Sequence, residues 1–338
     1  MNWLPYPAIL IILVGALLVY FRLARRYNIL DVPGERSSHT LPTLRGGGII
    51  FPLAFILWYL FIDRSQPIFL VALLLISLVS FIDDLYTLSG SIRMLVQLLA
   101  VSLMMWYAGI FGMHPLVIPL AYILIIGWIN AFNFMDGING ITPLYALTAL
   151  LTFLLLNNTG KLLPLVTDLP AGIEGWEFLP NSLLIVMTIS VGIFTYYNAR
   201  KRARIFAGDV GSVGMAFLLA WLMVSLMLKT ATFWWILLFA VYGVDTVSTI
   251  IIRLSRGENI FKPHRQHLYQ LMTNGLGWPH LKVAGLYATI QFLFNGLTIG
   301  LYFTGQLNLG TASIVTATLL AGYIAIRFSV HRQLYSKG

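Results

Sequence analysis

The acidic residues of this chain stand at the ends of long apolar runs. The adjacent carboxylates Asp83 and Asp84 directly follow the apolar residues 68–82. Asp136 closes a second such run, and Asp209 follows a third. A charged group near hydrocarbon costs about 2.5–3.5 kcal/mol even on lenient insertion scales, so each of these residues is a candidate for function. Carboxylates at the ends of separate spans can share one polar cavity and, together with Asn side chains, they suit a hard cation such as Mg²⁺.

The acidic pair cannot act as one unit, because adjacent residues on a helix point about 100° apart. We therefore expect one of Asp83 and Asp84 to face substrate while its neighbour binds a cation or a helix end. A solvated pair of loop acids is the alternative. Arg93, near the start of the next apolar run, could return to the same pocket and clamp a phosphate. A role as a membrane-surface anchor is the alternative for this arginine.

Polar residues recur at helical spacing before Asp136. Asn130, Asn133 and Asp136 are three residues apart and so line one face of a helix end. Gly137 then permits a tight turn or a close approach of the backbone to a ligand. Asn133 and Asp136 offer oxygen atoms of the kind that Mg²⁺ or a nucleotide uses. Helix capping is the alternative interpretation for Asn130 and Asn139.

Residues 206–214 read as a glycine-rich loop that enters a helix. Gly208, Gly211 and Gly214 would expose backbone N–H groups there, and the N-terminus of a helix favours anions. Asp209 in such a setting would repel phosphate unless a metal ion bridged them, which again favours Mg²⁺. The loop lacks the Lys-Ser/Thr of a nucleotide-binding P-loop, so the glycines alone are a weak signal.

Two further loops carry basic residues and histidines. Lys262, His264, Arg265 and His267 lie in the longest basic loop, and their cationic and hydrogen-bonding groups suit a diphosphate or a sugar. An amphipathic interfacial helix is the alternative there, and zinc is disfavoured because further ligands are lacking.

The first loop, residues 31–48, holds Arg36, His39 and Arg45, which could bind a phosphate head group or anchor the loop at a lipid surface. Asp245 is a further intramembrane acid, which we expect to pair with a basic loop residue.

The composition is that of a polytopic membrane protein. The 338 residues are 59% hydrophobic and only 10% charged, with a mean hydropathy of +0.84. The absence of cysteine excludes disulfides, thiolate catalysis and zinc–thiolate sites. The net charge of +9 is explained by basic loops on the cytoplasmic side rather than by nucleic acid, which we do not expect as a partner.

Apolar runs predict about eleven transmembrane helices in an all-α integral membrane protein of one domain, residues 1–338. With the N-terminus outside and the C-terminus inside, every Lys and Arg except Arg64, Lys161 and Lys229 falls on the cytoplasmic side. The expected helices are residues 5–23, 47–63, 67–82, 92–110, 115–130, 138–156, 181–199, 212–228, 231–252, 283–303 and 310–328.

This topology places the acids and the histidine loop on one side of the membrane. The sequence therefore predicts a cytoplasmic active-site cleft rather than a pore. A transporter of an anionic or lipid-linked substrate is the competing interpretation, but it should carry polar residues at mid-membrane and on both sides. A CDP-alcohol phosphatidyltransferase would continue beyond Asp136 and Gly137 with a run of Arg and Asp that this chain lacks.

Five segments in this order resemble the polyprenyl-phosphate N-acetylhexosamine-1-phosphate transferase superfamily of glycosyltransferase family 4. They are residues 31–48, 83–84, 130–140, 206–214 and the histidine loop 262–267. The resemblance implies a helical fold of ten or eleven spans in the bacterial inner membrane. It also implies transfer of a sugar-1-phosphate from a UDP-N-acetylamino sugar to undecaprenyl phosphate, with release of UMP and with Mg²⁺ or Mn²⁺ as cofactor. A homodimer is left open.

Position by position, the resemblance implies roles for these residues. The metal ligands would be Asp209 and Asn133. The catalytic residues would be Asp83, Asp84, Asp136 and Arg93. We expect substrate contacts from Asn130, Asn139, His264, Arg265, His267, Lys262, His39 and Arg45.

Two departures narrow the substrate. Thr87 stands where some relatives carry a third acid after the acidic pair. Residues 264–267 read His-Arg-Gln-His rather than the triple histidine of the cell-wall branch, and this pattern favours the branch that initiates O-antigen or a related surface polysaccharide. The donor would then be a simple UDP-N-acetylamino sugar, 6-deoxy sugars included.

Overall fold

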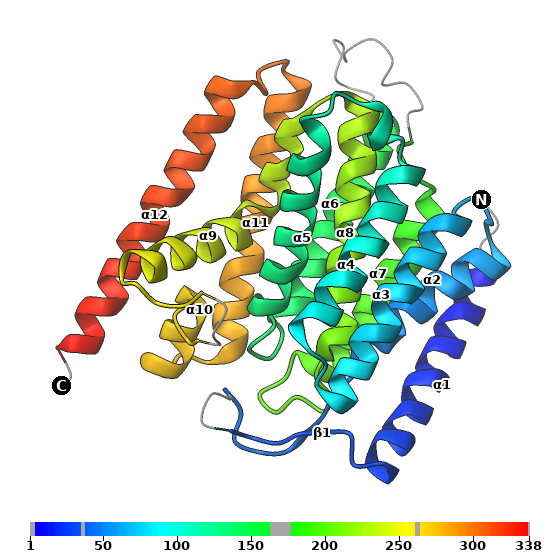
Figure 1. The fold of residues 1–338 in the computed structure, drawn as a ribbon, viewed down its shortest axis with the longest axis horizontal. Helices are drawn as coiled ribbons and strands as arrows, with labels where there is room; N and C mark the ends of the chain where they lie inside the picture. The colour runs from blue at the N-terminus through cyan, green and yellow to red at the C-terminus, as the bar shows by residue number, and fades with distance from the viewer. Residues whose placement is uncertain (1–3, 35–37, 163–176, 261–263, 337–338) are drawn as a thin grey trace.

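The computed structural model describes residues 4–34, 38–162, 177–260 and 264–336. Within these ranges the chain is almost entirely helical (Figure 1). The α-helices are α1 (Pro5–Arg26), α2 (Ile50–Phe61), α3 (Pro67–Tyr86), α4 (Gly90–Tyr107), α5 (Val117–Met135), α6 (Ile141–Leu162), α7 (Asn181–Asn198), α8 (Gly208–Thr230), α9 (Ala240–Ser255), α10 (Leu268–Gln270), α11 (His280–Phe303) and α12 (Leu309–Tyr335). Short helical turns are η1 (Gly47–Ile49), η2 (Ile110–Gly112), η3 (Phe233–Phe239) and η4 (Leu271–Gly275), and the strands are β1 (Leu30–Asp31) and β2 (Thr43–Leu44).

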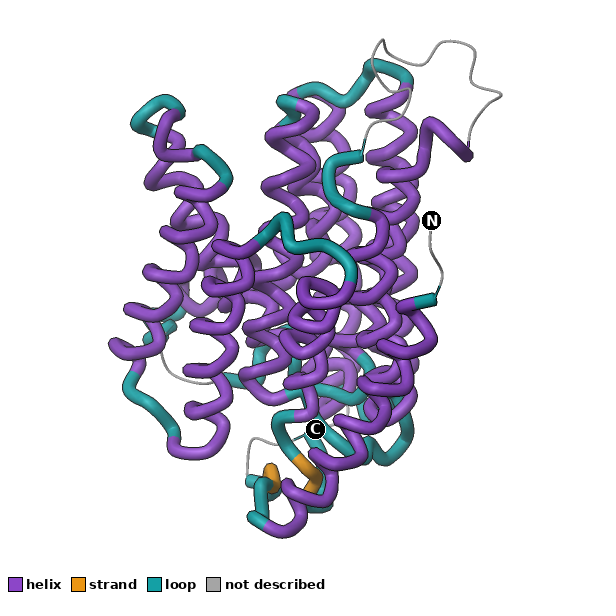
Figure 2. The backbone as a smooth tube through the Cα atoms, turned by 90° about the vertical axis from the view of Figure 1, so that its right-hand side faces the viewer, coloured by secondary structure: helices purple, strands orange, loops and turns teal. Residues whose placement is uncertain are grey.

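All eleven apolar runs of the sequence are helical, but fewer of them qualify as membrane spans by length and apolarity. In the described part of the chain nine helices do so. The run at 47–63 forms the shorter helix Gly47–Phe61, and α7 is not among the nine. The helices stand nearly side by side, with loops gathered at the two ends (Figure 2). This arrangement is that of an integral membrane protein.

Helix α8 forms the centre of the bundle. Of its most apolar window, 89% is buried inside the protein, far more than for α12, where the share is 22%. A helix that is apolar on every face is stable when other helices surround it. Aromatic rings fix its neighbours: Phe69 of α3 stacks on Trp221 of α8 at a centroid distance of 4.0 Å. The position of α8 matters because its first turn carries Asp209.

Helix α9 leaves the bundle obliquely and meets α12, which stands apart at the left of Figure 1. It follows the 3₁₀ segment η3, and this change of helix type leaves backbone groups without regular partners. Gln291 of α11 compensates: its Oε1 accepts from the N–H of Val241 at 2.9 Å, and its Nε2 donates to Leu237 O at 3.1 Å. In hydrocarbon every backbone polar group needs such a partner, so Gln291 permits the bend.

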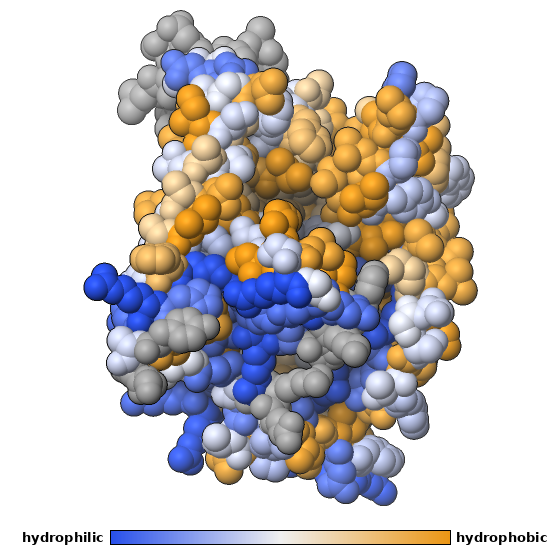
Figure 3. Space-filling model, turned by 60° about the vertical axis from the view of Figure 1, so that its left-hand side comes forward, coloured by the Kyte–Doolittle hydropathy of each residue, from blue (hydrophilic) through white to orange (hydrophobic). Residues whose placement is uncertain are grey.

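The polar loops collect at one end of the bundle. Strands β1 and β2 form a two-stranded antiparallel hairpin that lies at the lower end in Figure 1. Leu44 of β2 also bridges in parallel to Ile205, so the first loop is attached to the segment that enters α8. Hydrophilic residues gather over the lower part of the face in Figure 3, beneath a largely apolar band.

Candidate active site

Asp84 binds the N-terminus of α8. Its Oδ1 accepts from the N–H of Asp209 at 2.8 Å, and its Oδ2 accepts from the N–H of Val210 at 3.1 Å. The first N–H groups of a helix have no partner within the helix, and the helix dipole favours a negative charge there. No side chain of the preceding segment caps α8, so a carboxylate from α3 provides the cap. The expectation that one member of the acidic pair binds a helix end is confirmed.

The glycine-rich segment 206–214 does not form the phosphate-binding loop that the sequence predicts. The helix begins at Gly208 rather than after the glycine-rich segment, and Asp84 already occupies its first amides. Gly211 packs against the backbone of Gly48, where a Cβ on either residue would collide with the other. Gly208 has a φ of +70°, and a Cβ there would meet the Asp84 carboxylate. The glycines therefore serve close packing of the first loop on α8 rather than anion binding.

Arg45 contacts both Asp84 of α3 and Asp209 of α8, at the junction of these two helices. Its Nε lies 2.7 Å from Asp84 Oδ1, and its Nη2 lies 3.6 Å from Asp209 Oδ1. The loop that carries it is held in place because the Phe206 N–H donates to Leu44 O at 2.7 Å. The Asp84 side chain is fully inaccessible, whereas that of Asp209 is 20% exposed. Asp209 is therefore the acid of this pair that a ligand can reach.

Asp83 faces the other way, toward the start of α4. It accepts from the N–H of Leu88 through one oxygen, and Arg93 Nη1 lies 3.3 Å from the other. The Arg93 side chain is 49% exposed, so it can pair with Asp83 and still contact a ligand. The carboxyl groups of Asp83 and Asp209 lie within hydrogen-bonding reach of each other. Two carboxylates so close require a proton or a cation between them.

The donors at this junction fit a magnesium ion that also binds a ligand. Within the described ranges no three His, Cys, Asp or Glu side chains are grouped so that they could hold a metal by themselves. Asp209 and Asp83 supply oxygen atoms, and Mg²⁺ commonly takes only one or two carboxylates, with substrate phosphates and water completing its shell. Asn133, the other predicted metal ligand, is half-buried on the last turn of α5.

Asp136 lies at the end of α5 and is held by Thr142, whose hydroxyl donates to its Oδ1 at 2.5 Å. Burial raises the pKa of Asp136 to about 6, and the nearby Asp84 carboxylate adds to this shift. An acid with such a pKa holds its proton over part of the physiological range. Tyr269, in α10, donates to Phe134 O at 2.9 Å and so joins the histidine loop to this segment.

Two asparagines that were predicted to bind substrate, Asn130 and Asn139, make hydrogen bonds to other parts of the protein. Asn130 donates to Gln97 Oε1 of α4 at 3.0 Å. Asn139 donates to Arg200 O at 2.9 Å, which fastens the loop between α7 and α8. His39 packs edge-on against Phe206 with a centroid distance of 4.8 Å.

Asp245 fixes the histidine loop. It accepts from the N–H of Leu268 at 3.0 Å and from the hydroxyl groups of Tyr287 at 2.7 Å and Tyr323 at 3.2 Å. His267 Nδ1 lies 3.5 Å from Asp245 Oδ1, as expected for an intramembrane acid paired with a loop residue. Both ring nitrogens of His267 are buried and have no hydrogen-bond partner among the described residues.

Arg327 of α12 supports the same loop, because its Nη2 donates to Gln266 O at 3.0 Å. The imidazoles of His264 and His267 lie 4.9 Å apart. Burial and the neighbouring cationic groups lower the pKa of His264 to about 4, so it is neutral at physiological pH. Arg265 is half-buried beside them, and Lys262 lies outside the described residues.

Gln97, Gln291 and Arg327 were not predicted to contribute to the site. Each is a polar residue inside an apolar helix, which is the signal that could have found them. Each makes a hydrogen bond to another helix or loop. These three residues therefore support the helices and loops that carry the site.

Comparison with known proteins agrees with this geometry. Residues 66–227 match glycosyl transferase family 4, and this stretch contains all four acids of the junction and of the α5 end. The chain is 25% identical over 296 residues to a protein of Bacillus subtilis (strain 168) described as a probable undecaprenyl-phosphate N-acetylglucosaminyl 1-phosphate transferase, covering 81% of this chain and 77% of that protein.

Two enterobacterial proteins named undecaprenyl-phosphate alpha-N-acetylglucosaminyl 1-phosphate transferase are similar to the same extent. The protein of Yersinia pestis is 26% identical over 282 residues, which cover 76% of this chain and 72% of the relative. That of Escherichia coli (strain K12) is 26% identical over 297 residues, which cover 78% and 74%. The matched segment, the helical fold and the cluster of acids all make this chain similar to glycosyl transferase family 4 and to these transferases.

Proposed function

We propose that this protein transfers a sugar-1-phosphate from a UDP-N-acetylamino sugar to undecaprenyl phosphate and releases UMP. The junction of α3 and α8 carries this proposal: Asp83, Asp84 and Asp209 converge there with Arg45 and Arg93. Such a site can bind a metal ion together with two phosphorylated ligands. The names of the relatives supply the class of acceptor and donor.

In the proposed reaction an oxygen of the lipid phosphate attacks the sugar-linked phosphorus of the diphosphate. The bond from this phosphorus to the bridging oxygen breaks, and UMP departs with the electron pair. The second pKa of a phosphate monoester is about 6, so the nucleophile is already mostly dianionic at neutral pH. Asp83 therefore needs only to take up a residual proton and to position the lipid phosphate.

Arg93 and Arg45 offset the negative charge of the two phosphorylated substrates. Asp209, together with Asp83 and with Asn133 of α5, would hold Mg²⁺ or Mn²⁺, which would neutralise charge on the diphosphate and on the departing UMP. A covalent aspartyl-phosphate route is the second choice, since the cluster of acids is explained by metal binding and positioning. His267 Nε2 and the neutral His264 offer hydrogen bonds to the nucleotide-sugar.

The same proposal sets the protein in the bacterial inner membrane with eleven spans, the N-terminus outside and the acids at the cytoplasmic face. Support comes from the basic loops, which gather with the hydrophilic surface at one end of the bundle (Figure 3). The product would initiate a surface polysaccharide such as O-antigen.

A radiolabel transfer assay tests this function. Membranes that contain the protein would receive undecaprenyl phosphate, Mg²⁺ and a panel of UDP-N-acetylamino sugars, each labelled in the sugar. We expect labelled lipid with one donor, loss of the product with EDTA, and reversal on addition of UMP. If folded protein transfers sugar from none of the donors, the proposal is contradicted. The interpretation as a transporter of an anionic or lipid-linked substrate would then be favoured.

A further inference from the structure

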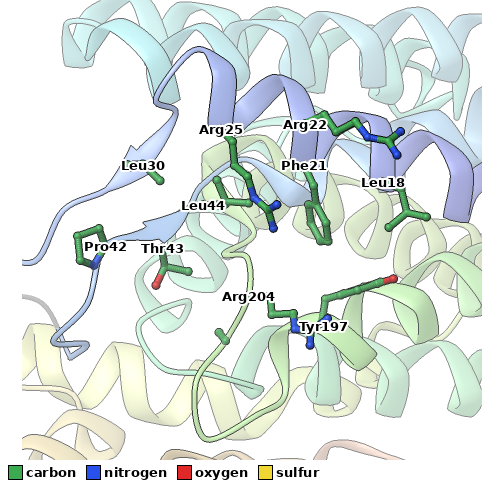
Figure 4. A pocket seen from close by; sticks show the side chains of 11 residues that line it. Leu18, Phe21, Arg22, Arg25, Leu30, Pro42, Thr43, Leu44, Tyr197 and Arg204 are labelled. Carbon is green, nitrogen blue, oxygen red and sulfur yellow. The ribbon is translucent and has the colours of Figure 1, made fainter.

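A cavity of the described structure lies away from the acids of the α3–α8 junction. It has a volume of about 810 Å³ and lies between the lower end of α1, the β1–β2 hairpin and the segment that joins α7 to α8. Figure 4 shows Arg25 and Phe21 extending from α1 toward Tyr197 and Arg204. Arg22 completes a set of three arginines in its lining, which contains no acidic residue.

No carboxylate of the described residues pairs with these three arginines. Within the described residues, Arg22, Arg25 and Arg204 make no ion pair, although other arginines of the chain do. Three guanidinium groups around one cavity repel each other unless an anion lies between them. The planar guanidinium binds phosphate oxygens through paired hydrogen bonds, so phosphate is the anion that this arrangement suits best.

The apolar part of the lining continues along α1 from the arginines. Leu18, Arg22 and Arg25 are four and then three residues apart, so they form one stripe along α1. Leu18 is 42% exposed on this stripe, above the arginines, and Phe21 packs edge-on against Tyr197 at 5.0 Å. A ligand of this cavity therefore meets positive charge at the end of the helix and apolar surface along it.

We propose that this cavity binds the head group of an anionic phospholipid, with the phosphodiester among the arginines and an acyl chain along Leu18. General attraction of basic loops to an anionic membrane would need only exposed arginines. Here the arginines come from two distant segments of the chain and line one cavity together with Leu44 and Tyr197.

The bound lipid would also stabilise the catalytic junction. Leu44 lines the cavity and precedes Arg45, while Arg204 lines it and precedes the segment that enters α8. A head group between Arg25 and Arg204 would hold both segments together at the point where the N–H of Phe206 donates to Leu44 O. The binding proposal is independent of the proposed function, whereas this activating effect rests on it.

The test uses a matched pair of double variants of the full chain in detergent. Arg25→Gln with Arg204→Gln removes two charges from the cavity. Arg26→Gln with Arg202→Gln removes two charges from the same segments at residues that do not line it. Native mass spectrometry would count retained phosphatidylglycerol, with phosphatidylcholine and inorganic phosphate as separate additions. Size-exclusion profiles and circular dichroism would establish that both variants are folded.

We expect one retained phosphatidylglycerol, bound at least about tenfold more weakly by the cavity variant and equally well by the control variant. Equal weakening in both variants would reduce the site to general surface attraction and overturn the proposal. Displacement by millimolar inorganic phosphate would show a site for a free anion and would overturn it too.

Transfer assays separate the two proposals. Phosphatidylglycerol should raise turnover of the wild-type protein and of the control variant, but not of the cavity variant, with the KM for undecaprenyl phosphate unchanged. A raised KM for undecaprenyl phosphate in the cavity variant alone would assign the cavity to the acceptor substrate and contradict the proposal. If no variant transfers sugar while lipid retention still differs, the proposed function fails and the lipid site stands.

Discussion

Asp84 accepts the backbone N–H of Asp209 at 2.8 Å, so that two acidic residues 125 positions apart meet at the first turn of α8. The contact places a carboxylate that a ligand can reach beside one that is fully buried. It also explains why the buried acid is tolerated: two N–H groups and Arg45 share its charge. Asp84 thus fixes the geometry of the site, and Asp209 offers its oxygen atoms to a ligand.

Replacement of Asp84 should therefore damage both the fold and the activity. Asp84→Asn keeps the shape but turns an N–H donor toward amides that need acceptors, which should lower the free energy of unfolding by about 1–3 kcal/mol. Transfer should fall at least about a hundredfold, since Arg45 and Asp209 lose their common partner. Thermal unfolding and the radiolabel assay measure the two effects. Asp63→Asn is the control, because Asp63 caps only an exposed turn at Ser65. Full activity in Asp84→Asn would refute the assigned role.

Asp245 is expected to act on the nucleotide-sugar through His267. Asp245→Asn should raise the KM for the UDP-sugar about tenfold, with the KM for undecaprenyl phosphate unchanged, because the loop loses the acceptor that orients His267. His267→Ala should have a similar effect, and the double variant should be little worse than either single one. Additive losses would mean that Asp245 serves only the stability of α9, α11 and α12.

The acid and the histidine with shifted pKa values should change stability with pH in opposite directions. Asp136 has a raised pKa of about 6, so the folded state holds more protons than the unfolded state between about pH 4 and 6. Its contribution to stability is present at low pH and is lost as pH rises through about 6. His264 has a pKa lowered to about 4, so its contribution is lost as pH falls below about 6.5.

Thermal unfolding between pH 4 and 7 measures this difference. Relative to the wild type, stability of Asp136→Asn should fall less, or rise more, as pH increases across this range. His264→Gln should show the reverse, with relatively greater stability at pH 4 to 5. Parallel curves for the two variants and the wild type would mean that neither residue titrates differently in the folded and unfolded states.

The sequence predicted the helices well because membrane spans are long and apolar. Every expected run is helical, and even the short segment that begins at Gly47 is a helix. The spacing of the acidic pair also predicted that its two members would face different ways, one of them toward a cation or a helix end. Nothing in the spacing identified Asp84 as that member or α8 as the helix, because the contact joins distant segments.

Other parts of the site could not be derived from local pattern. Glycine-rich residues before an apolar run fit an anion cradle and a close helix packing equally well, and only the contact between Gly48 and Gly211 decides between them. The same holds for Asn130, whose place on a helix face suits a ligand or a neighbour such as Gln97. A polar side chain in a membrane helix predicts a partner but not which one.

Metal binding should depend on the substrate, since no group of three or more ligating side chains exists within the described residues. We expect Mn²⁺, used as a paramagnetic probe, to bind the protein alone weakly and at least about tenfold more tightly when a UDP-sugar is present, because the diphosphate completes the coordination shell. Asp209→Asn should abolish this increase and lower transfer at least about a hundredfold. Electron paramagnetic resonance of free Mn²⁺ measures binding without turnover. Asp31→Asn, in the β1–β2 hairpin, is the control and should retain the increase. Undiminished Mn²⁺ binding by Asp209→Asn would remove Asp209 from the metal site and leave Asp83 as the carboxylate to test next.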